Sequence, residues 1–169
     1  MSDLLSSHEE VTATKYNTGI KAGAIIGRGR RLSNSSTTTT EIGVLEVDDI
    51  PIKAGRIYKV ETSSLLLTTS VANDIVVARL RMTTDGSTPS TSSTLLTQSA
   101  ERVEVTANGG YTHVVGTYAP TVDETLSILL SVGRGAGTGN VGINFASAVP
   151  IEVWITDAGV DPGDTGVDL

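Results

Sequence analysis

Apolar and polar residues alternate with a period of two along most of the chain, as they do in strands that bury one face. In segment 124–132, Leu, Ile or Val occupies every second position from 126 onward, and we expect these side chains to point inward. The intervening Thr125, Ser127 and Ser131 are expected to point outward. Similar runs predict eight or nine strands, at residues 22–32, 37–47, 56–67, 71–84, 102–106, 111–118, 124–132, 141–145 and 150–156.

Turn-forming sequences separate these runs, among them Asp85-Gly86 and Asn108-Gly109-Gly110. Short strands at such intervals, with no segment of helical periodicity, predict an all-β fold. We expect a single β-sandwich or jelly roll of about eight or nine antiparallel strands. The expected organisation is an N-terminal arm at residues 1–18, the sandwich at 19–156 and an acidic C-terminal tail at 157–169.

Composition narrows the functional classes. The chain has 169 residues, no cysteine and a net charge of −7, so it lacks both a thiol for chemistry and the basic surface typical of nucleic-acid binders. No apolar run approaches the roughly 18 residues that a membrane span needs. The first residues also lack the basic and apolar regions of a signal peptide. We therefore expect a protein made in a cytoplasm, with no nucleic-acid or membrane partner.

Candidate chemistry is sparse. The glycine pattern at residues 137–142 matches a dinucleotide-binding motif literally, but an alternating segment follows it where that motif requires a helix, so we expect a hairpin loop. The only histidines are His8 and His113, neither with a neighbour at metal-ligand spacing. No Gly-x-Ser-x-Gly nucleophile motif occurs. We predict a non-enzymatic protein with no catalytic residue, cofactor or metal, and with His113 exposed or at an interface.

Three features are candidates for contact with other chains. The first is a basic cluster in which Arg28 and Arg30 share one face of a strand; it would dock an acidic surface such as another copy's tail, or simply form a polar strand face. The second is Trp154, which alternates with inward-facing neighbours and is therefore expected on the outer face. The third is the acidic tail, either solvated or docked on a partner, with Asp157 as its first carboxylate. The candidate interface residues are Arg28, Arg30, Arg31, Trp154, Asp161, Asp164 and Asp168.

Several short segments give the chain a resemblance to a known family. They are TTTTEIGVL at 37–45, IPIKAGRIYKV at 50–60, VANDIVVARLRMTTDGSTP at 71–89 and PIEVWITDAG at 150–159. Together they resemble small β-sandwich virion proteins of tailed bacteriophages that infect actinobacteria, of the capsid decoration or minor tail type. The resemblance implies a virion component, often multimeric, that is made in the cytoplasm of a bacterial host. It supplies no active-site residues.

We accordingly expect a capsid decoration (cement) protein, a homotrimer that contacts the major capsid protein or other virion proteins and stabilises the head through many linked contacts. A minor tail or tail-tip protein is the alternative within the same class. A carbohydrate-binding module for host attachment is the alternative from another class, with Trp154 as its aromatic contact. Fold alone does not decide among them.

Overall fold

The computed structural model describes residues 23–106, 109–146 and 149–163, and every regular element in these ranges is a strand. The strands are β1 (Ala24–Arg31), β2 (Ile42–Ile52), β3 (Arg56–Thr62), β4 (Leu65–Thr69), β5 (Asp74–Thr83), β6 (Thr94–Val103), β7 (Gly110–Thr112), β8 (Val115–Tyr118), β9 (Glu124–Ala136), β10 (Val141–Asn144) and β11 (Ile151–Val160). The predicted all-β fold is confirmed. The predicted arm at residues 1–18 lies outside the described residues. No helix of the described residues is long and apolar enough to cross a membrane.

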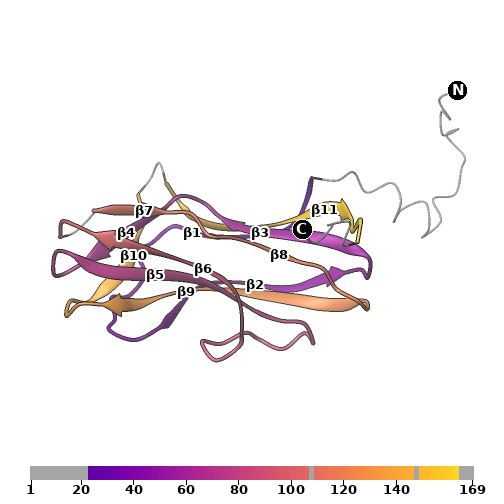
Figure 1. Ribbon diagram of the computed structural model, residues 1–169, viewed down its shortest axis with the longest axis horizontal. Coiled ribbons are helices and arrows are strands. Elements are labelled where there is room, and N and C mark those ends of the chain that lie inside the picture. Colours follow the sequence, from indigo (N-terminus) through magenta and orange to yellow (C-terminus); the bar gives the residue numbers. More distant parts are fainter. Residues whose placement is uncertain (1–22, 107–108, 147–148, 164–169) are drawn as a thin grey trace, which may run out of the picture.

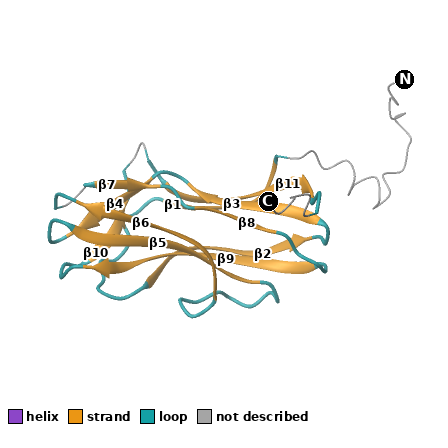
Figure 2. Cartoon of the chain, in the orientation of Figure 1, coloured by secondary structure: helices purple, strands orange, loops and turns teal. Residues whose placement is uncertain are grey.

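Two layers of antiparallel strands pack face to face as a β-sandwich (Figures 1 and 2). One layer is the sheet β2-β9-β5-β6. The other contains the sheet β1-β11-β3-β8 and the shorter sheet β10-β4-β7. These two sheets follow one another along the same layer, because β4 continues from β3 and β8 continues from β7 with only two residues between them.

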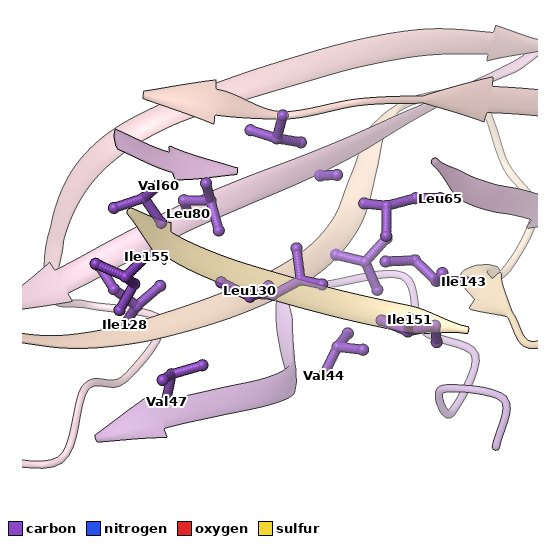
Figure 3. Close-up of a cluster of buried hydrophobic side chains, with 14 of the residues drawn as sticks. Val44, Val47, Val60, Leu65, Leu80, Ile128, Leu130, Ile143, Ile151 and Ile155 are labelled. Atoms are coloured by element: carbon purple, nitrogen blue, oxygen red, sulfur yellow. The ribbon is translucent and has the colours of Figure 1, made fainter. Parts of the chain in front are cut away.

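The core lies between the layers and consists almost entirely of Val, Leu and Ile (Figure 3). Val60 and Ile155 from one layer and Leu80 and Leu130 from the other are fully buried. This confirms the predicted inward faces of the strands that carry them. Burying such side chains is worth about 1.5–3 kcal/mol each, which is how a chain with few aromatic residues stabilises a sandwich.

Strand β9 departs from the expected pattern of one buried face. The predicted inward residues are buried, but Ser127 and Ser131, predicted to point outward, have exposed fractions of only 1% and 0%, and Leu129 between them has 2%. The two serines lie on the outer face of the strand, as predicted, but other residues cover them there, so they are not exposed. β9 is a central strand, paired with β2 on one side and β5 on the other, and both of its faces are covered.

Other boundaries also differ from those predicted. The predicted strand 56–67 is two strands, because the chain passes from the β3 sheet to the β4 sheet at residues 63–64. β2 continues past the expected break at Asp48–Asp49. Its register with β9 shifts there, so β2 has more residues than the facing part of β9, and Asp49 has a positive φ of 58° at this bulge. β6 begins at Thr94, in a segment with no clear alternation, because this edge strand is largely exposed.

Residues 137–140 of the glycine-rich segment connect the two layers, since β9 and β10 belong to different sheets, and residues 141–142 are the start of β10. The predicted hairpin loop is therefore wrong in detail, although no helix follows the glycines. The buried carboxylate of Asp74 holds the segment by accepting hydrogen bonds from the amides of Thr138 (3.0 Å) and Gly139 (2.8 Å) and from the Thr69 hydroxyl (2.7 Å). These bonds lower the pKa of Asp74, the Thr69 bond most.

Candidate binding face

The outer surface of the β1-β11-β3-β8 sheet brings together three of the predicted interface residues. One row of directly paired residues crosses all four strands: Arg28 on β1, Trp154 on β11, Glu61 on β3 and Val115 on β8. Arg30 lies in the next row on the same face, opposite Glu152. We call the surface formed by Arg28, Arg30, Lys59, Glu61, Glu152 and Trp154 the Trp154 face.

The sequence Gly27-Arg28-Gly29-Arg30 explains how β1 presents its arginines. An added Cβ at Gly27 would lie 2.8 Å from the Ile50 side chain, and one at Gly29 would lie 2.7 Å from a Val47 methyl group. Only glycine allows β1 to lie this close to β2 on the inner side. The alternation of the strand then directs both arginines to the outer face, as predicted.

Glu152 organises the two arginines. Its Oε1 accepts from Nη2 of Arg28 at 2.5 Å and lies 3.0 Å from Nε of Arg30. The glutamate side chain is 7% exposed, whereas the arginine side chains are 53% and 50% exposed. Each guanidinium group has five N–H donors, and within the described residues only one donor of each is engaged by Glu152, so the others can bind a ligand.

Trp154 is half-buried between these charges, on the outer face that the alternation predicted. Across the sheet, Glu61 forms an ion pair with Lys59 at 2.8 Å, and its other oxygen lies 3.7 Å from Nε2 of His113. The side chain of His113 is half exposed, in keeping with the expected exposed or interfacial position. The face thus offers one large aromatic surface bordered by ionic groups.

Arg31 does not join this face. Its guanidinium group donates to the backbone carbonyls of Val44 (2.8 Å) and Asn34 (2.6 Å), and its Nε to that of Ser33 (3.2 Å). These bonds hold the segment after β1 against β2. Of the three arginines expected to form one cluster, only Arg28 and Arg30 lie together on the Trp154 face. Arg31 instead binds backbone carbonyl groups of β2 and of the segment after β1.

The acidic tail also begins later than predicted. β11 continues to Val160, and Asp157 is a buried residue whose carboxylate receives two hydrogen bonds from Arg56, each of 2.7 Å. Reading Asp157 as a solvated or docking carboxylate was wrong. The sequence contained a signal for this. In β11 every second residue points inward, so Asp157 follows Ile155 on the inner face. In β3 the same rule places Arg56 on the inner face, two residues before Tyr58.

Of the three candidate acidic residues, only Asp161 lies within the described residues. Its backbone N–H donates to the carbonyl of Gly55 (2.9 Å), and its Oδ1 accepts from the amide of Gly163 (2.9 Å). Asp161 therefore both ends the pairing of β11 and shapes a turn. Asp164 and Asp168 lie outside the described residues.

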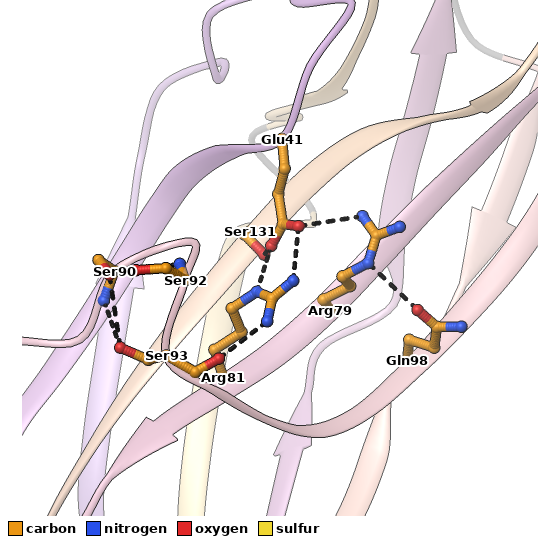
Figure 4. A network of polar contacts seen from close by, with 8 residues as sticks. All are labelled: Glu41, Arg79, Arg81, Ser90, Ser92, Ser93, Gln98 and Ser131. Atoms are coloured by element: carbon orange, nitrogen blue, oxygen red, sulfur yellow. Dashed lines mark hydrogen bonds and ion pairs between the residues drawn. The ribbon is translucent and has the colours of Figure 1, made fainter.

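A second polar network lies on the outer face of the opposite layer (Figure 4). Arg81 binds Glu41 through two hydrogen bonds of 2.5 and 2.7 Å, and Ser131 donates to the same carboxylate at 2.6 Å. The bond from Arg81 is the main reason why the pKa of Glu41 is lowered. Ser131 is buried at this point because Glu41 covers it. Sequence reasoning missed this network, since its members come from separate segments.

Among the described residues, no group of three or more His, Asp or Glu side chains is arranged to hold a metal ion. Lys53 and Asp123 form an exposed ion pair of 2.7 Å at one end of the sandwich, where Asp85 and Glu124 line the same shallow hollow. Tyr118 donates to Glu124 nearby at 2.7 Å, and burial, together with this bond, raises the pKa of the tyrosine to about 12.

No protein-family model and no curated protein matches the chain. Among solved structures, it is similar to the CBM22-1-GH10 modules of Clostridium thermocellum xylanase 10B in complex with xylohexaose (TM-score 0.40, 10% identity, 88% of this chain), where it spans 30% of that protein. It is also similar to the CBM22-1 xylan-binding domain of Paenibacillus barcinonensis Xyn10C (TM-score 0.39, 8% identity, 82% of this chain and 97% of that one). A third is the Eiger TNF of S. frugiperda (TM-score 0.39, 15% identity, 88% and 95%). None of these likenesses bears on the function proposed below.

Proposed function

We propose that this chain is a non-enzymatic structural protein of a bacteriophage particle, and specifically a decoration protein that binds the outside of the head. The resemblance of its sequence segments to small phage virion proteins supports this assignment. The feature of the fold that carries it is the Trp154 face, where a buried glutamate orders two half-exposed arginines beside an aromatic ring on the outer side of a sheet.

A face that combines ionic groups with a large aromatic side chain suits contact with another protein surface. Ion pairs at the rim of such an interface are individually weak, because water and salt screen them. A decoration protein overcomes this by binding a repeating lattice, where linked contacts raise the effective concentration of every further contact. We propose that the partners are other copies of the chain, arranged as a homotrimer, and the major capsid protein.

Copy number and location test this assignment. We expect quantitative mass spectrometry of particles from the encoding phage to find the chain in hundreds of copies, and separated heads without tails to retain it. A few to some tens of copies, recovered with isolated tails, would instead identify a minor tail protein. Absence of the chain from purified particles would refute the virion assignment as a whole.

Carbohydrate binding is the second candidate, and the position of Trp154 favours it. A tryptophan on an open sheet face next to carboxylate and guanidinium groups can stack on a sugar ring while those groups bind its hydroxyls. The isolated protein would then bind glycans of the host surface, and Trp154→Ala would abolish binding. Glycan-array binding that does not depend on Trp154 would contradict this second candidate.

A further inference from the structure

The Trp154 face carries more cationic than anionic groups, although the whole chain has a net charge of −7. Arg28 and Arg30 share the single carboxylate of Glu152, and Lys59 is matched by Glu61. Among the described residues that form the face, one positive charge therefore remains, at the arginine pair beside Trp154. A face of this kind attracts an acidic segment that also offers an apolar side chain.

The chain itself contains such a segment. Residues 161–168 carry Asp161, Asp164 and Asp168 with no cationic residue among them, and Val167 adds an apolar side chain. Resting on the proposed role as an assembling particle protein, we propose that the Trp154 face binds residues 164–168 of a second copy of this chain.

The chemistry of the two surfaces matches. Carboxylates such as Asp164 and Asp168 are natural ligands of guanidinium groups, which can bind them through two parallel hydrogen bonds. Glu152 already holds Arg28 and Arg30 in place, so less side-chain freedom is lost when a ligand binds. Val167 lies between the two aspartates in the sequence and can cover the half-buried ring of Trp154.

Distance favours a second copy over the same chain. Arg28 lies opposite Trp154, and Trp154 precedes Asp161 by seven residues. At about 3.3 Å per residue in a strand, Arg28 is therefore about 23 Å from the start of the tail, measured along β11. Asp164 follows Asp161 by three residues and reaches at most about 11 Å. Within one chain only Asp168 could approach Arg28, whereas the tail of another copy can bring both carboxylates.

Sedimentation of the full chain at low and high salt tests the proposal. We expect the wild type to self-associate at low salt. Asp164→Asn/Asp168→Asn should weaken this association about tenfold without altering the sandwich, because both positions follow the last strand. Arg28→Gln/Arg30→Gln should do the same. Lys53→Gln/Arg102→Gln makes an equal change in charge away from the face and should leave association unchanged.

A charge exchange tests whether the contact joins two chains. A copy with Arg28→Glu/Arg30→Glu and a copy with Asp164→Lys/Asp168→Lys should each stay monomeric and should associate when mixed. The proposal is overturned if the wild type stays monomeric at every salt concentration, if the tail variant associates like the wild type, or if the exchanged copies fail to pair while circular dichroism shows both folded. Particle copy number separately tests the proposed function, which can fail while self-association persists.

Discussion

The buried pair of Arg56 and Asp157 offers the sharpest test of how this sandwich is stabilised. The change we consider is Asp157→Asn, which keeps the volume of the side chain and removes its charge. In the folded chain the two side chains are 9% and 2% exposed and are joined by two hydrogen bonds of 2.7 Å. Oδ1 of Asp157 also accepts from the amide of Gly159 at 2.9 Å, where β11 bulges.

The size of the effect follows from the burial of the partner. Removing one member of a buried ion pair costs about 3–5 kcal/mol, because the remaining charge is left uncompensated out of water. Asparagine retains one acceptor oxygen, so the lower end of this range, about 3 kcal/mol, applies here. For a domain of this size that corresponds to a melting temperature lower by about 6–12 °C.

Thermal unfolding followed by circular dichroism measures this shift. Lys53→Gln removes an exposed ion pair from the same end of the sandwich and should shift the melting temperature by less than about 3 °C. The double change Arg56→Met/Asp157→Leu should be milder than the sum of its single changes, since neither buried charge then remains. An Asp157→Asn protein that melts together with the Lys53→Gln control would refute our account of the buried pair.

Three further outcomes follow from contacts described above. The pKa of Glu41 is lowered in the folded state, so ionised Glu41 stabilises the fold at pH values above its unfolded pKa. This stabilisation is lost as the pH falls through the lower folded pKa, so Glu41→Gln should flatten the decrease in melting temperature measured below about pH 5. Gly137→Ala should destabilise the protein in urea far more than Gly55→Ala, because both have positive φ but only the Cβ at Gly137 would overlap a buried carboxylate. Arg31→Gln should lower stability by about 1 kcal/mol in the same assay through its lost backbone contacts, whereas Arg30→Gln should change stability less and self-association more.

Alternation along the chain was enough to predict the fold class and most inward faces. It placed Trp154, Arg28 and Arg30 on outer faces correctly, because each side of a strand follows from sequence position alone. The same rule, applied for one more step in each direction, would have found Arg56 and Asp157. The prediction instead ended the domain at residue 156 and assigned Asp157 to the tail, and it gave Arg56 at the start of strand 56–67 no inward position, since charged residues are rarely buried.

Other features depend on contacts between segments distant in sequence. Glu152, which Arg28 contacts, lies 124 positions further along the chain, and Glu41, which covers Ser131, lies 90 positions before it, so no local pattern indicates either pair. The predicted strand at 102–106 overlaps only the last two residues of β6, because an exposed edge strand needs no apolar face and its earlier residues show no clear alternation.

The sequence by itself determined that this is an all-β protein and which way most side chains point, since strand geometry is local. The tertiary structure alone decided which strands are neighbours, which faces are covered twice, and that two arginines, a glutamate and a tryptophan form one face. The physical reason is that strand pairing in this sandwich joins residues far apart in the chain, and these pairings fix both the charge and the shape of its surface.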